Sequence, residues 1–303
     1  MVLERLYGYN VLFKALSTLF ALGFGVAGLC LFGVYKYQNK LVYPAYLNDG
    51  HGKVDTPDQY GMNSYKLARI TTKDGETLYG YLVTHDPNSV SYTNKTVVVF
   101  CPNAGNIGHF LPVVQILHLT MGYNVFIYSY RGYGNSTGVP SEAGLKIDAE
   151  RILEYLCENE QIAKSSLIFY GRSLGGAVAI YLASQHPDKV AALVLENTFL
   201  SIREVIPHVF PLLAPVKGLC HEVWDSESAI QKIPADIPIC FFSGEDDEIV
   251  PPSHMARLCE LSKSREKEMH IFPGAKHNDT IIQKDYWVYF QQFLVSRVNP
   301  RGR

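Results

Sequence analysis

Short β-branched segments alternate with helix-length segments from about residue 60 onward, and this alternation limits the possible folds more than any other feature. The run Thr96–Cys101 is rich in valine, which is typical of a strand buried on both faces. Apolar residues at helical spacing predict helices after Ser141, over Ala177–Gln185 and over Asp279–Val295. Further strands are predicted over 124–129, 166–170, 191–195, 237–242 and 269–272. The alternation implies a mostly parallel sheet with helices on both faces.

Two segments depart from the alternation. The segments 64–72 and 77–84 flank an Asp-Gly turn and predict an antiparallel hairpin. The stretch 197–235 is apolar and interrupted by prolines, and we interpret it as a lid-like insert above the sheet. Ordinary packing helices are the alternative interpretation, and the two overlap because a lid must itself pack on the domain.

An uncharged run of about 20 residues, Ala15–Val34, precedes the alternating region. A helix of that length crosses about 30 Å of hydrocarbon, so we expect a transmembrane helix within an N-terminal segment 1–40. A cleaved signal peptide would have a shorter apolar core of about 7–15 residues and a small-residue cleavage site. A linker is expected over 41–60 and the main domain over 61–303. Lys36, Lys40 and Lys53 give a slight positive-inside bias toward a cytosolic domain.

Composition excludes several classes of function. The 303 residues carry a formal net charge of −2, without the clustered basic surplus of a nucleic-acid-binding protein. The six cysteines show no metal-ligand spacing and fall mostly in apolar runs, so we expect buried thiols, no metal and no organic cofactor.

The third parallel strand runs directly into Gly171-Arg172-Ser173-Leu174-Gly175, and a helix follows. This is the G-x-S-x-G pattern of a nucleophile elbow in the strand–turn–helix context that it requires. The chain must reverse within a few residues, and side chains at Gly171 or Gly175 would collide with neighbouring backbone. Ser173 is therefore the predicted nucleophile.

A serine nucleophile needs a base, and the acid and base follow it in the order Ser, Asp or Glu, His. The fifth parallel-sheet strand ends in an acidic loop with Asp247, the predicted acid, beside Asp246 as the nearest alternative. Glu196, at the end of another strand, is a weaker alternative. His277 follows the last strand and is the predicted base, which would take the serine proton while the acid fixes its tautomer.

The backbone N–H of Leu174 is expected to form one half of an oxyanion hole, because it follows the nucleophile. The other half should come from the loop after the first parallel strand, Cys101-Pro102-Asn103. Proline has no N–H, so we assign the second donor to Asn103.

These motifs together resemble one family. They are NAGNIG, SYRGYGNS, YGRSLGGA, LENTFLSI and SG-x-x-D-x-IVPP followed by HNDT. The set is similar to membrane-anchored α/β-hydrolase-domain proteins related to the fungal bud-emergence suppressor, over nearly the whole chain. The resemblance implies the α/β-hydrolase fold, a single N-terminal span and serine-hydrolase chemistry at Ser173, Asp247 and His277. The chain departs from the usual His-Gly before Asn-Ala-Gly, where it has Cys101-Pro102.

The expected function is hydrolysis of acyl esters or thioesters at a membrane, with lipidated proteins or lipid esters as substrates. An endomembrane, of the endoplasmic reticulum or vacuole, is expected rather than the plasma membrane. Two alternatives stay open: a catalytically silent membrane scaffold in cell polarity or morphogenesis, and a peptidase of the same fold. Arg131 and Tyr133 are interpreted either as pocket residues or as parts of a structural turn.

Overall fold

The computed structural model describes residues 2–89 and 92–298, which divide into two compact units. The first unit ends at Leu41 and consists of helix α1 (Val2–Val42), whose last residue already belongs to the second unit. Residues Leu16–Val42 are apolar and long enough to cross a membrane, and Phe20, Phe24 and Leu29 expose most of their side chains. The apolar helix predicted over 15–34 is therefore part of a longer helix.

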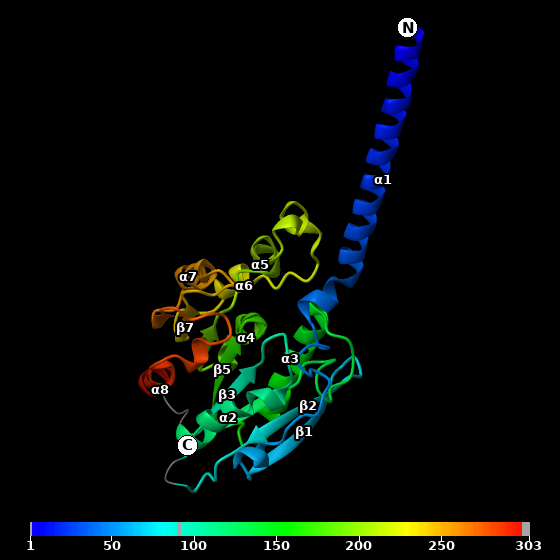
Figure 1. The fold of residues 1–303 in the computed structure, drawn as a ribbon. Helices are drawn as coiled ribbons and strands as arrows, with labels where there is room; N and C mark the ends of the chain where they lie inside the picture. Colours follow the sequence, from blue (N-terminus) through cyan, green and yellow to red (C-terminus); the bar gives the residue numbers. More distant parts are fainter. Residues whose placement is uncertain (1, 90–91, 299–303) are drawn as a thin grey trace. The chain divides into compact units, whose positions relative to one another are not determined.

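The second unit is built on one eight-stranded sheet (Figure 1). Its order is β1-β2-β4-β3-β5-β6-β7-β8, in which β2 pairs antiparallel with both β1 and β4 and all later neighbours pair parallel. The strands are β1 (Tyr65–Thr71), β2 (Thr77–Val83), β3 (Lys95–Phe100), β4 (Asn124–Tyr128), β5 (Ser166–Arg172), β6 (Ala192–Glu196), β7 (Ile239–Gly244) and β8 (Lys267–Phe272). The prediction of an α/β-hydrolase fold with a mostly parallel sheet is confirmed.

Helices follow the parallel strands as the alternation predicts. They are α2 (Leu111–Gln115), α3 (Glu142–Glu158), α4 (Leu174–Gln185), α5 (Ile202–Val209), α6 (Ser226–Ile230), α7 (Pro252–Leu261) and α8 (Tyr286–Arg297), with the 3₁₀ helices η1 (Pro57–Tyr60), η2 (Ile107–Phe110), η4 (Pro187–Lys189), η5 (Pro211–Leu219) and η6 (Thr280–Ile282) and the π-helical segment η3 (Ile116–Thr120). Strands β3, β4, β5, β6 and β7 are buried along their whole length. Their carboxyl ends meet at one edge, where ligands bind in sheets of this kind.

The closing helix is shorter than predicted. The segment expected as a helix over Asp279–Val295 is a 3₁₀ turn over Thr280–Ile282 followed by α8, which begins only at Tyr286. The interruption falls at Asp285, whose backbone adopts a positive φ of 64°. A residue in that conformation cannot continue a right-handed helix.

The connection from β6 to β7, residues 197–238, carries α5, η5 and α6. Its middle exposes Val209, Phe210, Leu212 and Leu219, and Leu212 is 94% exposed. Proline at position 207 lies inside α5 and Pro211 begins η5, so no long helix can form here.

Arg131 is a structural residue of the loop after β4. Its guanidinium group bonds to Asp148 of α3 at 2.7 Å and to Asp74 of the β1–β2 turn at 2.7 Å. These hydrogen bonds from Arg131 lower the pKa of Asp74 to about 2. Tyr133, on the same loop, donates its hydroxyl to the carbonyl of Asn103 at 2.7 Å. The loop after β4 therefore supports the loop after β3.

Candidate active site

Ser173 lies at the sharp turn between β5 and α4, with φ of 52° and ψ of −119°. A positive φ is rare for a residue other than glycine and persists only where its surroundings enforce it. The N–H of Ser173 donates to the carbonyl of Glu196 at 2.8 Å, and the Ser173 carbonyl accepts from the Thr198 hydroxyl at 2.8 Å. Both partners belong to the end of β6 and the residues just after it, so this neighbouring strand end holds the turn.

Gly171 and Gly175, on either side of Ser173, cannot be replaced by a larger residue without a clash, because other backbone atoms approach them closely. A Cβ atom at Gly175 would lie 1.9 Å from the carbonyl oxygen of Phe100 at the end of β3. A Cβ atom at Gly171 would lie 2.3 Å from the carbonyl oxygen of Gly175. The side-chain collisions predicted from the sequence would thus occur with the turn itself at Gly171 and with β3 at Gly175. The start of α4 can approach β3 this closely only because Gly175 has no side chain.

Asp247 and His277 form a buried pair on neighbouring loops after β7 and β8. Asp247 Oδ2 lies 2.7 Å from His277 Nδ1, and both side chains are less than a tenth exposed. Asp247 Oδ1 accepts the backbone N–H groups of Ile249 at 2.9 Å and Val250 at 2.8 Å. These bonds fix the carboxylate, so its second oxygen faces the imidazole and the Nδ1–H donates to it.

The two alternative acids lie elsewhere. Asp246 has an exposed side chain, and its backbone N–H bonds to the carbonyl of Ala275. Glu196 is fully buried and accepts hydrogen bonds from the hydroxyls of Tyr170 at 2.6 Å and Tyr286 at 2.8 Å. Burial, and then the nearby carboxylate, raise the pKa of both tyrosines well above the ordinary value, so the hydroxyls stay protonated and keep donating.

Hydrogen bonds connect the loop of His277 to the turn of Ser173. They come from side chains to which the sequence analysis assigned no role. Arg172, directly before Ser173, donates from Nη2 to the His277 carbonyl at 2.9 Å and to Asn278 Oδ1 at 2.8 Å. Asn197 donates to the same carbonyl at 3.1 Å and accepts from the N–H of Gly244 at 2.9 Å. The ends of β5, β6, β7 and β8 are therefore tied together around the three predicted residues.

Asn197 has a signal that sequence reasoning could have used. It adopts a positive φ of 45°, and asparagine tolerates that conformation better than most residues. The sequence gives no comparable signal for Arg172. An arginine next to the nucleophile serine could equally form an ion pair at the surface or a hydrogen bond in the interior.

The predicted oxyanion donors lie on the expected elements. Leu174 is the first residue of α4, and the first four N–H groups of a helix have no acceptor inside it. Asn103 is on the loop after β3, where its carbonyl accepts from Tyr133 and its side-chain Nδ2 donates to the carbonyl of Val42 at 3.0 Å. The loop carrying Asn103 is thus held from two sides.

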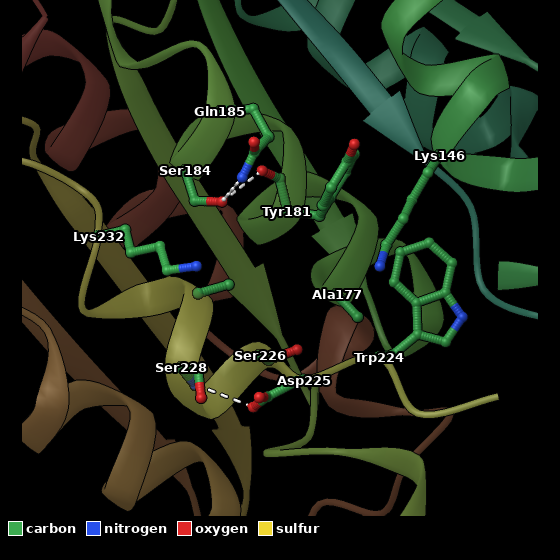
Figure 2. Close-up of a pocket in the computed structure, with 11 residues that line it drawn as sticks. Lys146, Ala177, Tyr181, Ser184, Gln185, Trp224, Asp225, Ser226, Ser228 and Lys232 are labelled. Atoms are coloured by element: carbon green, nitrogen blue, oxygen red, sulfur yellow. Dashed lines mark hydrogen bonds between the residues drawn. The ribbon is translucent and has the colours of Figure 1, made fainter. Parts of the chain in front are cut away.

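A cavity of about 190 Å³ opens along α4, as Figure 2 shows. Ala177, one helical turn after Ser173, lines it together with Tyr181, Trp224 and Lys146. The Lys146 ammonium lies 4.9 Å from the ring centre of Tyr181 and 5.5 Å from that of Trp224, and pairs with Glu142 at 2.6 Å. Its charge is already balanced, and the cavity contains none of the predicted catalytic residues.

Comparisons with known proteins agree with this architecture. Residues 96–216 match the family model described as alpha/beta hydrolase fold. The Saccharomyces cerevisiae membrane protein YNL320W is 47% identical over 87% of this chain and 91% of its own length. Protein bem46 of Schizosaccharomyces pombe is 43% identical over 94% of this chain and 92% of its own length. The Arabidopsis thaliana alpha/beta hydrolase domain-containing protein WAV2 is 35% identical over 90% of this chain and 94% of its own.

Solved structures show the same fold at low sequence identity. The Pyrococcus furiosus esterase Pf2001 aligns with a TM-score of 0.68 at 20% identity, covering 83% of this chain and 98% of the esterase. Est1E from Butyrivibrio proteoclasticus aligns with a TM-score of 0.59 at 15% identity, covering 76% of this chain and 98% of that protein.

The glycine requirement of the turn gives a stability prediction. We expect Gly175→Ala to lower the free energy of unfolding by about 1–3 kcal/mol or more, because its Cβ meets the backbone of β3. Gly218→Ala is the matched control, since a Cβ there meets nothing within 4 Å. Denaturant unfolding of the two full-length variants measures the difference, and equal stabilities would contradict the close approach.

Proposed function

The chain belongs to the family of α/β-hydrolase-domain proteins that includes Schizosaccharomyces pombe bem46, and we propose that it is a membrane-anchored serine hydrolase that cleaves acyl esters or thioesters. The observation that carries the proposal is the buried Asp247–His277 pair, on loops tied to the turn that presents Ser173. No metal or organic cofactor enters the reaction as proposed.

In this reaction His277 removes the proton of the Ser173 hydroxyl as the oxygen attacks the acyl carbonyl. Asp247 keeps the Nδ1–H of His277 oriented toward itself and stabilises the imidazolium that forms. Because both Asp247 oxygens are engaged, one by backbone N–H groups and one by the imidazole, the ring has little freedom to turn. His277 then returns the proton to the departing alcohol or thiol, and water releases the acyl group by the same route.

Negative charge develops on the carbonyl oxygen during the attack. We assign its stabilisation to the backbone N–H groups of Leu174 and Asn103, and loss of one such donor costs about 2.7–4 kcal/mol of barrier in other enzymes. The position of Leu174 at the start of α4 supports this assignment, because its N–H has no acceptor within the helix.

The N-terminal helix and the β6–β7 connection support a proposal for the location of the substrate. We propose that α1 anchors the protein in a bilayer, which agrees with its length and apolar surface and with a relative named as a membrane protein. We further propose that the β6–β7 connection acts as a lid. Its exposed Phe210 and Leu212 suit contact with an acyl chain, so lipidated proteins or lipid esters are the proposed substrates.

Labelling with a fluorophosphonate probe tests the serine chemistry. We expect the full-length protein in membranes to react covalently with the probe, and Ser173→Ala to abolish the reaction. Ser228→Ala, which changes an exposed serine of α6 outside the predicted catalytic residues, is a matched control that should label like the wild type. A Ser173→Ala variant that still reacts would exclude this nucleophile, and a folded wild type that does not react would favour the scaffold.

The acid can be assigned by a pair of adjacent variants. We expect Asp247→Asn to lower kcat for a short acyl ester by about 10³–10⁴-fold, because the amide can no longer hold the His277 tautomer. Asp246→Asn changes an exposed neighbour and should keep a rate close to the wild type. If the two variants lost activity equally, or if Asp246→Asn alone did, the assignment of Asp247 would be wrong.

A further inference from the structure

Tyr43 is the first residue after α1, and it is buried in the second unit with 2% of its surface exposed. Its hydroxyl donates to Glu222 Oε2 at 2.6 Å and accepts from the indole Nε1–H of Trp224 at 2.7 Å. Burial raises the pKa of Tyr43 far above its ordinary value, and Glu222 adds to this, so the hydroxyl keeps its proton. Both partners lie on the return limb of the β6–β7 connection, which we define as residues 220–225.

The start of α3 holds the same return limb from another side. The Glu142 carboxylate accepts the backbone N–H groups of Val223 at 2.6 Å and Trp224 at 3.0 Å. In return, the N–H of Glu142 donates to the Glu222 carboxylate. Two carboxylates with little exposure are thus satisfied by backbone N–H groups and by the Tyr43 hydroxyl, which leaves the return limb little room to shift.

Trp224 is held in a conformation that it would not adopt alone. Its backbone has a positive φ of 47°, and the residue is 2% exposed and forms part of the wall of the cavity along α4. A bulky residue in this region of φ,ψ space persists only where its surroundings over-determine it. The Tyr43 hydroxyl is the side-chain partner of the indole N–H, so its loss would free Trp224 to relax.

The residue just before Tyr43 contacts a second part of the site. The carbonyl of Val42 accepts a hydrogen bond from the side chain of Asn103 at 3.0 Å. Asn103 is also the residue whose backbone N–H we assign to the oxyanion hole. The last residue of α1 and the first residue after it therefore contact the oxyanion loop and the return limb.

We infer that Val42 and Tyr43 are positioning residues of the active site, through which the end of the membrane helix sets the oxyanion loop and the lid. The inference rests on the proposed function, since it assigns a regulating element to the same site. Tyr43 directly follows Val42, the last residue of α1, in the chain. A displacement of the helix end is thereby transmitted to the loop that stabilises the transition state.

Tyr43→Phe in the full-length protein tests this role, because it removes one hydroxyl and keeps the ring. We expect the rate of fluorophosphonate labelling and the kcat for a short acyl ester to fall about fivefold or more, as for the loss of about one hydrogen bond. KM should change less, because a short ester makes few contacts with the lid. Tyr46→Phe, three residues later and 60% exposed, is the matched control and should retain the wild-type kcat.

A fluorescence readout separates positioning from misfolding. The chain has two tryptophans, so Trp287→Phe leaves Trp224 as the sole indole. In that background we expect Tyr43→Phe to shift the Trp224 emission to longer wavelength while the thermal unfolding transition remains cooperative. Glu222→Gln should act in the same direction, and the double variant should lose less than the product of the two separate effects, because the two residues act through one contact.

The outcomes distinguish this inference from the proposed function. Unchanged kcat and unchanged Trp224 emission in Tyr43→Phe would overturn the positioning role while leaving Ser173 as the nucleophile. An additive double variant would also contradict it. A wild type that does not label would instead reject the serine-hydrolase proposal, and the Trp224 emission would still decide whether Tyr43 holds the return limb.

Discussion

The candidate site depends on the backbone of Ser173 being held at positive φ between β5 and α4. That conformation is unfavourable for serine, and the cost is offset by hydrogen bonds to Glu196 and Thr198 and by the packing of Gly175 against the carbonyl of Phe100. The turn therefore exists only because three parallel strands, β3, β5 and β6, end side by side. The sheet order brings them together, and the absent side chain at Gly175 lets α4 begin at the sheet edge.

Buried polar groups connect this turn to the base. A lone charged or polar group in the interior would be costly, yet Arg172, Asn197 and Glu196 each have hydrogen-bonded partners from a neighbouring loop or strand. Arg172 and Asn197 converge on the carbonyl of His277, so the base loop is fixed through its backbone and the imidazole is fixed through Asp247. Such a network favours a single arrangement, because removing one member leaves the others buried without partners.

The sequence could predict what depends on local patterns. The strand–glycine–serine–glycine–helix succession specifies the turn at Ser173, and the order of loops selects Asp247 and His277, which the structure brings into contact. The roles of these residues remain predictions. The prediction of a long closing helix was wrong. The helix is interrupted at Asp285 by a backbone conformation that the periodicity of the sequence does not reveal.

Contacts between distant residues could not be predicted in this way. Tyr43 falls in the segment that reads as a linker, and its partner Trp224 lies 181 residues later in the chain. Arg131 fits a pocket as well as a turn until Asp148 and Asp74 are seen to pair with it. Side-chain pairs of this kind depend on which surfaces the whole fold places together, and a single sequence contains no periodicity that reports them.

Trapping the acyl-enzyme tests the central claim most directly. The full-length protein would be mixed with an excess of a short p-nitrophenyl ester, quenched in acid within the first turnover and digested for mass spectrometry. The account predicts a burst of about one nitrophenolate per chain and the acyl group on the peptide that contains Ser173. An acyl group on another residue, or hydrolysis without a burst or an adduct under conditions where deacylation is slow, would contradict Ser173 as the nucleophile.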